Sequence, residues 1–172
     1  MDSLSDCIDL KSFQLIKSIG EGTFGNVYLV KKNDTDQTFA AKVIKKSIEQ
    51  NSTEELISLF REIMINSKLD HPNILKFIGI SPFDFEKKPK FTIVTEYASN
   101  GSLSNVLELE RRGLSPLNWN DTKKLITIYG IASGMSYLHD NHIIHRDLKP
   151  DNILLNEYLF PKISDFGLSK VK

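Results

Sequence analysis

One eight-residue segment constrains this chain more than any other feature of its sequence. His145–Asn152 reads His-Arg-Asp-Leu-Lys-Pro-Asp-Asn, which places a carboxylate, a lysine and an amide within six residues. Ile143-Ile144 and Ile153-Leu154-Leu155 are short apolar runs on either side of it, Lys162-Ile163-Ser164 is a further short strand candidate, and Asn156-Glu157 is a turn signal between the last two. We therefore expect brief strands that hold a polar loop, with Asp165-Phe166-Gly167 directly after the last strand.

The composition excludes several classes of protein. The 22 basic and 22 acidic residues balance, so there is no general electrostatic reason to bind nucleic acid or an anionic membrane. A single cysteine, Cys7, cannot form an intrachain disulfide, which fits a reducing compartment. No apolar run approaches the ~20 residues that span a bilayer, and the acidic start is unlike a signal peptide. We expect a cytoplasmic protein.

The first part of the chain is rich in predicted strands. Apolar runs punctuated by polar turns predict strands at 13–16, 27–30, 38–44, 74–80 and 91–96, with a turn at Asn33–Asp36. One helix interrupts them, capped by Ser52 or Thr53 and ending near Leu69. Its expected apolar stripe comprises Leu56, Leu59, Phe60, Ile63 and Met64.

The pattern becomes helical after 99–101, where we place a boundary between two lobes. A longer helix is predicted from Asp121 to His139, capped by Asn120 or Asp121. Three- and four-residue spacing indicates a buried face, which consists of Leu125, Ile128, Ala132, Met135 and Leu138.

A glycine-rich segment follows the first predicted strand. Gly20, Gly22 and Gly25 fit G-x-G-x-x-G, a spacing that lets backbone amides approach phosphate oxygens. The same spacing also fits a dinucleotide-binding turn or a plain glycine-rich hairpin. A dinucleotide fingerprint opens a helix, whereas 26–30 reads as a strand, so a strand–turn–strand flap is favoured.

Three histidines suggest an alternative, a zinc site. His139, His142 and His145 recur every three residues, but residues 141–144 read as a turn that enters a strand, and no nearby cysteine or carboxylate completes a ligand set. We interpret these histidines as structural or solvent-facing.

Taken in order, the glycine-rich segment, Ala40-Ala41-Lys42, His145–Asn152 and Asp165-Phe166-Gly167 resemble the eukaryotic protein kinase family. The resemblance implies an α+β, two-lobed fold whose N-lobe is a five-stranded antiparallel sheet with one helix, and whose C-lobe is helical. Residues 1–12 would be a tail and 13–172 the kinase domain, with 13–98 as N-lobe and hinge and 99–172 as a partial C-lobe.

The same resemblance implies roles for the polar residues. Asp147 would be the catalytic base, Lys149 would neutralise the γ-phosphate, and Asn152 with Asp165 would ligate magnesium. Lys42 would bind the α- and β-phosphates of ATP and pair with Glu62, with Glu55 as the second candidate. The implied ATP-binding residues are Gly20, Glu21, Gly22, Thr23, Phe24, Gly25, Val27, Ala40, Lys42, Glu62, Thr95, Glu96, Ala98 and Leu154.

One position departs from the family pattern. Phe77, His145 and Phe166 match the hydrophobic column that links the two lobes, but its fourth member falls on Asn66, where the family usually has Met or Leu. Burying an unpaired amide there would cost about 1–3 kcal/mol, so the helix carrying it is expected to be weakly held in its active alignment.

Lys149-Pro150-Asp151 resembles the serine/threonine type, and residues 95–97, 101–103 and 131–139 resemble the tyrosine-kinase-like branch. The expected function is transfer of the ATP γ-phosphoryl group to a protein hydroxyl in signal transduction, with Mg²⁺ as cofactor. The family continues after Asp-Phe-Gly with an activation segment and further helices, so the chain is expected to be incomplete and its long helix to expose apolar surface to a partner. The alternative is a catalytically inactive fragment that binds nucleotide or a partner.

Overall fold

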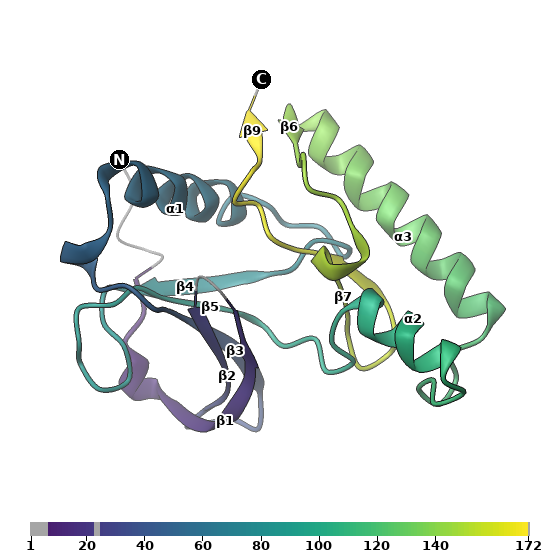
Figure 1. Cartoon of the computed structure of the whole chain (residues 1–172), viewed down its shortest axis with the longest axis horizontal. Helices are drawn as coiled ribbons and strands as arrows, with labels where there is room; N and C mark the ends of the chain where they lie inside the picture. The colour runs from purple at the N-terminus through teal and green to yellow at the C-terminus, as the bar shows by residue number, and fades with distance from the viewer. Residues whose placement is uncertain (1–6, 23–24, 172) are drawn as a thin grey trace. The chain divides into compact units, whose positions relative to one another are not determined.

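The computed structural model describes residues 7–22 and 25–171, which form two compact units (Figure 1). The first unit runs up to Phe60 and includes Phe77–Tyr97. The second unit comprises Arg61–Lys76 and the chain from Ala98 onward. The two units are described separately below.

The first unit is built on a five-stranded sheet in the order β1-β2-β3-β5-β4, and every neighbouring pair is antiparallel. This architecture confirms the predicted N-lobe sheet. The prediction for the fourth strand began too early, because Ile74 makes only an isolated bridge to Ile163. The strands are β1 (Phe13–Glu21), β2 (Gly25–Lys32), β3 (Thr38–Ile44), β4 (Phe77–Ser81) and β5 (Thr92–Glu96).

The core of this unit lies on one face of the sheet. Val30, Ala41 and Val94 come from three adjacent strands and are fully buried, as alternation along each strand requires. A short 3-10 helix, η1 (Leu10–Ser12), adds Leu10, and Phe13 packs edge-on against Phe39 with ring centroids 5.7 Å apart. The strand prediction therefore selected the right elements for this core.

Helix α1 (Thr53–Asn66) follows a second 3-10 turn, η2 (Ile48–Gln50), and belongs partly to each unit. Ser52 caps it as predicted: its Oγ accepts from Glu55 N at 3.2 Å, and Glu55 Oε2 accepts from Ser52 N at 2.8 Å. The predicted apolar stripe is wrong in part, because Phe60 and Met64 are exposed whereas Ile63 is buried. The helix also ends at Asn66, before the predicted Leu69, and a turn follows.

The second unit combines two helices with four short strands. Strands β7 and β8 form an antiparallel hairpin, and β6 pairs with β9. The helix at Leu103–Arg111 and the strand at Lys170–Val171 were not predicted from the sequence. The elements are α2 (Leu103–Arg111), α3 (Asp121–Asp140), β6 (Ile143–Ile144), η3 (Pro150–Asn152), β7 (Ile153–Leu155), β8 (Pro161–Ile163) and β9 (Lys170–Val171).

The signal for α2 was its N-cap. Ser102 Oγ accepts from Asn105 N at 3.2 Å, and Gly101 supplies the left-handed turn before it with φ of 68°. The helix contributes Val106 to a small core with Trp119, Leu155 and Leu159. A nine-residue helix with one buried residue gives too weak a periodic pattern to recognise from sequence.

The long helix α3 is present as predicted and is capped by Asn120, whose Oδ1 accepts from Lys123 N. Its buried face was predicted wrongly in part: Leu125 and Ile128 are 67% and 65% exposed and Ala132 is also exposed, whereas Leu138 is fully buried and the half-buried Met135 packs against the core. Helix α3 packs on β8 through Gly130 and Gly134, which lie close to Pro161 and Ile163 of that strand. The residues that are buried on α3 are Thr127, Gly130, Gly134 and Leu138.

Two glycines explain this orientation of α3. A Cβ at Gly130 would lie 2.5 Å from Pro161 Cγ, and one at Gly134 would lie 2.8 Å from Ile163 Cδ1. The helix backbone therefore approaches the strand more closely than any larger residue allows. Periodicity counts apolar side chains and cannot see a contact made by glycine.

The main core of the second unit gathers residues from α1, α3 and the short strands. It contains the side chains that directly flank the polar loop, so burial fixes both ends of the loop. Its buried members are Ile65, Leu69, Ile74, Leu138, Ile143, Ile153, Ile163 and Phe166. In the described part of the chain, no helix combines the length and apolarity needed to cross a membrane.

Candidate active site

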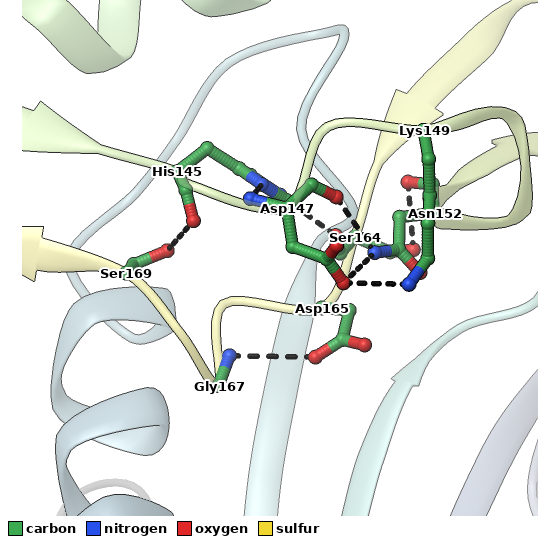
Figure 2. A network of polar contacts seen from close by, with 8 residues as sticks. All are labelled: His145, Asp147, Lys149, Asn152, Ser164, Asp165, Gly167 and Ser169. Carbon is green, nitrogen blue, oxygen red and sulfur yellow. Dashed lines mark hydrogen bonds and ion pairs between the residues drawn. The ribbon is translucent and has the colours of Figure 1, made fainter.

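The polar loop of the second unit runs from β6 to η3 and faces the segment that follows β8 (Figure 2). The hairpin β7–β8 pairs Ile153 with Ile163, and both side chains are buried. This pairing brings Asn152, at the end of the loop, alongside Ser164. Asp165 is the residue that follows Ser164 in the sequence. Local strand pairing, buried on its apolar side, thus assembles residues from two separate sequence motifs.

His145 anchors the start of the loop. Its imidazole is fully buried, with Nε2 3.0 Å from Ser164 O and Nδ1 accepting from Asp147 N at 3.3 Å. Because a carbonyl oxygen can only accept, the ring proton is assigned to Nε2. The ring meets Phe166 edge-on, with centroids 5.2 Å apart. Both ring nitrogens are engaged, which argues against the zinc alternative.

Asp147 is held by two polar side chains of the same loop, Lys149 and Asn152. Lys149 Nζ lies 2.8 Å from Asp147 Oδ2, and Asn152 Nδ2 donates to both Oδ2 and the backbone oxygen of Asp147 at 2.9 Å. The hydrogen bond from Lys149 lowers the pKa of the Asp147 carboxyl, and the bond from Asn152 adds to this against an opposing effect of burial. The result is an ionised carboxylate in a fixed orientation.

Lys149 experiences the converse effect. Its hydrogen bond to Asp147 raises its pKa, and the charges of Asp165 and Asp151 act in the same direction. The negative charge of Asp165 therefore stabilises the protonated ammonium group of Lys149. The structure brings together the four residues that the sequence proposed for catalysis and metal binding, Asp147, Lys149, Asn152 and Asp165.

Asp165 turns the chain out of the hairpin. Its φ is 63°, in the left-handed region where aspartate is tolerated better than most residues, and its Oδ1 accepts from Gly167 N at 3.3 Å. The residue is exposed while the following Phe166 is fully buried. Burial of the phenylalanine thus directs the carboxylate outward.

The donor set fits a magnesium ion. Asn152 Nδ2 is occupied by Asp147, which leaves the amide oxygen as the atom able to ligate a cation. Asp165 adds an exposed carboxylate, and hard oxygen ligands of this kind, few in number, suit Mg²⁺ bound together with phosphates and water. Among the described residues, no group of three histidine, cysteine or acidic side chains could hold a metal by itself.

Glu62 lies beside the Asp-Phe-Gly segment in the second unit. A Cβ built on Gly167 would be 3.6 Å from Glu62 Oε2 and 3.3 Å from Asp165 Oδ1. Its expected partner Lys42 belongs to the first unit, so that pair stays a prediction. The second candidate, Glu55, has both carboxylate oxygens engaged, by Lys46 Nζ at 2.5 Å and by Ser52 N.

The glycine-rich segment lies at the paired ends of the antiparallel strands β1 and β2 and does not open a helix, as the sequence favoured. Gly20 and Glu21 end β1, and Gly22 N donates to Gly25 O, at the start of β2, at 2.9 Å. A Cβ at Gly25 would lie 2.5 Å from Val43 O, so only glycine fits there without a shift of the backbone. The predicted ATP-binding residues Thr23 and Phe24 lie outside the described residues.

The other predicted nucleotide contacts fall on adjacent strands and on the second unit. Lys42 in β3 is half-buried between Val27 in β2 and Ile93 in β5, and Ala40 pairs with Thr95. Glu96 ends β5. Ala98 is buried and Leu154 is half-buried in β7, both within the second unit.

Residues 13–172 match the protein kinase domain. The chain belongs to the protein kinase family. It is 38% identical over 169 residues to the probable serine/threonine-protein kinase PBL23 of Arabidopsis thaliana, a match that covers 96% of the chain and 41% of the relative. It is 37% identical over 170 residues to the serine/threonine-protein kinase polo of Drosophila melanogaster, covering 98% of the chain and 27% of that relative.

A third relative is the probable serine/threonine-protein kinase PBL7 of Arabidopsis thaliana, 40% identical over 156 residues, which covers 89% of this kinase chain and 39% of the relative. The chain thus spans less than half the length of these relatives. The family assignment made from the sequence motifs is confirmed. Members of the family generally use ATP and Mg²⁺.

Two features of this kinase site were not assigned from sequence. Ser164 contacts both His145 and Asn152, and Arg146, with φ of 65°, donates from Nε to Leu168 O at 2.6 Å. The only sequence signal for Ser164 was its place at the end of the strand predicted at 162–164, directly before Asp165. In the predicted column, the contact of His145 with Phe166 is present, and Asn66 is buried with 7% exposure. Phe77 belongs to the first unit, so its part in the column stays a prediction.

Proposed function

We propose that this chain is the ATP-binding and catalytic-loop portion of a magnesium-dependent protein serine/threonine kinase. The observation that carries the proposal is the Asp147 carboxylate, ionised and oriented by Lys149 and Asn152. The serine/threonine names of the relatives support the class of substrate hydroxyl. Protein side chains with a hydroxyl group are the proposed substrates, and ATP is the proposed phosphoryl donor.

The residues would divide the reaction as follows. The oxygen of the substrate hydroxyl forms a bond to the γ-phosphorus while the bond from that phosphorus to the β–γ bridging oxygen breaks, and ADP leaves with the electron pair. Asp147 Oδ1 or Oδ2 accepts the hydroxyl proton. Lys149 would move from its ion pair to the transferred phosphoryl group. Asn152 and Asp165 would hold Mg²⁺, which when bound neutralises phosphate charge.

The nucleotide would be held mainly by backbone and apolar contacts. The amides of Gly20, Gly22 and Gly25 would face the phosphates, and Lys42 would contact the α- and β-phosphates and pair with Glu62. Glu21, Thr23, Phe24, Val27, Ala40 and Leu154 would surround the nucleotide, and Thr95, Glu96 and Ala98 would receive the adenine. We place this activity in the cytosol, which suits the lone exposed Cys7.

A second candidate is binding of nucleotide or a partner without catalysis. Asn66 favours this candidate, because its buried amide oxygen has no hydrogen-bond partner among the residues that the structure describes. An unpaired oxygen at this position would weaken the active alignment of the helix that carries it. A partner would pack on the exposed apolar side chains of α3, which include Leu125, Ile128 and Tyr129. Hydrogen exchange of α3 in the monomer tests this surface, since strong protection throughout would contradict it.

Transfer of radiolabelled γ-phosphate from ATP to a generic serine/threonine substrate separates the two candidates. With Mg²⁺ present, the chain should transfer label and Asp147→Asn should not, while Asp140→Asn at the exposed end of α3 should retain transfer. ATP binding without transfer would favour the second candidate. Absence of ATP binding would overturn the first candidate and would leave only partner binding in the second.

A further inference from the structure

Ser164 uses every polar group it has within the second unit (Figure 2). Its backbone N–H donates to Asn152 O at 2.9 Å, and its Oγ donates to the same oxygen at 3.0 Å. Its own carbonyl oxygen accepts from His145 Nε2 at 3.0 Å. The residue is only 8% exposed, so these bonds form away from competing water.

Ser164 connects Asn152 and Asp165, the two residues that are proposed to ligate a cation. Asn152 receives both donors of Ser164, and Asp165 is the next residue in the chain. Because Asp165 has φ of 63° and is exposed, the direction of its carboxylate depends on where the backbone of Ser164 is fixed. One residue therefore determines how the carboxylate of Asp165 is placed relative to the amide of Asn152.

Only one of the three bonds depends on the identity of the side chain. The N–H bond to Asn152 O extends the β7–β8 pairing by one step beyond Ile153 and Ile163, and any residue except proline would make it. The bond to His145 also uses backbone. The hydroxyl adds a second attachment to Asn152 O, which restrains rotation about the first.

We propose that the Ser164 hydroxyl is a positioning group that sets the spacing of the cation ligands Asn152 and Asp165. The inference rests on the proposed function of this site. Ser164 does not touch the ion; it acts through the backbone of one ligand and through its sequence link to the other. Loss of the hydroxyl should weaken cation binding more than it weakens nucleotide binding, because only the cation requires both ligands at a fixed separation.

Mn²⁺ is a suitable probe because free and bound Mn²⁺ differ in electron paramagnetic resonance. We would titrate Mn²⁺ into the complete 172-residue chain with excess ADP, for the unaltered protein and for Ser164→Ala. The Mn²⁺ dissociation constant should rise about fivefold in Ser164→Ala, in line with the loss of one hydrogen bond. ADP affinity at saturating Mn²⁺ should change less than about twofold, and Ser164→Thr should restore Mn²⁺ affinity because it keeps the hydroxyl.

A matched control removes a buried hydroxyl elsewhere. Thr127 in α3 is 3% exposed and donates to Lys123 O at 2.9 Å, so Thr127→Val loses a comparable bond to a backbone oxygen. It should lower the melting temperature without changing the Mn²⁺ dissociation constant. If Ser164→Ala does not fold, Ser164→Cys keeps a weak donor and should raise the dissociation constant by a smaller factor.

Three results would overturn the inference. An unchanged Mn²⁺ constant in Ser164→Ala would make the hydroxyl a structural bond only. Equal increases in Ser164→Ala and Thr127→Val would attribute the effect to general loss of stability. If the unaltered chain binds neither ADP nor Mn²⁺, the proposed function itself fails, which is a different result from binding that is insensitive to residue 164.

Discussion

Two asparagines in the second unit are buried to nearly the same extent but differ in their hydrogen bonding. Asn152 at the end of the polar loop is 6% exposed, and its Nδ2 donates twice to Asp147. Asn66 at the end of α1 is 7% exposed, and its Oδ1 has no partner in the described part of the chain. A low exposed fraction alone therefore does not show whether a buried amide is hydrogen-bonded or has an oxygen without a partner.

The difference lies in what each backbone provides. The polar loop turns back on itself, so the carboxylate and the backbone oxygen of Asp147 lie within hydrogen-bond distance of Asn152 Nδ2. Asn66 belongs to a helix, where the neighbouring backbone N–H groups donate within the helix, and it stands next to the core residue Ile65. An amide oxygen without a donor in that setting loses the hydrogen bonds it made to water. The same substitution at the two positions should therefore have opposite effects.

The largest expected effect is that of Asn152→Leu. It removes the proposed cation ligand and two donors from Asp147, so phosphoryl transfer should fall by at least ~10²-fold. The free energy of unfolding should also fall by about 1–3 kcal/mol, because the half-buried Asp147 keeps Lys149 alone as a side-chain partner. Steady-state kinetics and urea denaturation measure the two quantities. Retained transfer would break the comparison on its functional side.

Asn66→Leu should have a smaller effect of the opposite sign. Leucine has nearly the shape of asparagine and removes the unpaired oxygen, so the free energy of unfolding should rise by about 1–3 kcal/mol. Urea denaturation at neutral pH tests this, with the half-buried Ser67 changed to alanine at the next position as a reference for helix-end substitution. A destabilised Asn66→Leu would mean that the amide oxygen is satisfied, for example by a buried water.

The smallest effect concerns the pH dependence of the Asp147–Lys149 pair, which is partly exposed. The pKa of Asp147 is lowered, so its contribution to stability is complete above the ordinary value of 3.8 and is lost as pH falls through the lowered pKa. The pKa of Lys149 is raised, so its contribution is complete below 10.5 and is lost as pH rises through the raised pKa.

Lys149→Met should raise the pKa of Asp147 toward its ordinary value, with Asn152 still acting to lower it. The acid loss of stability should then begin at higher pH, and the alkaline loss contributed by Lys149 should disappear. Denaturation midpoints measured in acid and in alkali test both limbs, and Lys68→Met at an exposed position is the control. An acid limb identical to that of the unaltered chain would show that Lys149 does not govern Asp147.

Much of the fold could be predicted where local signals were strong. The strand at Thr38–Ile44 was predicted with its observed ends, and the caps at Ser52 and Asn120 mark the starts of α1 and α3. Such elements are specified by residues close in sequence, through alternation and through side chains that satisfy the first amides of a helix. Helix α2 was missed because its only clear local signal was Ser102.

The candidate site divides in the same way. Asp147, Lys149, Asn152 and Asp165 could be selected from sequence because their residue types and spacing fit phosphoryl transfer. Ser164 could not be selected, because its importance comes from pairing with Asn152, twelve residues away. The orientation of α3 was likewise invisible, since it depends on two glycines that meet Pro161 and Ile163.

The sequence by itself determined which chemical groups this kinase carries, which strands form its five-stranded sheet, where α1 and α3 begin, and the family to which it belongs. These properties follow from residue identity and short-range spacing, which the chain retains whatever its conformation. Only the tertiary structure decided which buried polar groups have partners, which face of α3 is covered, and which serine joins the proposed cation ligands. Those outcomes depend on contacts between distant segments, and a hydrogen bond or a close backbone approach exists only once packing has brought both sides together.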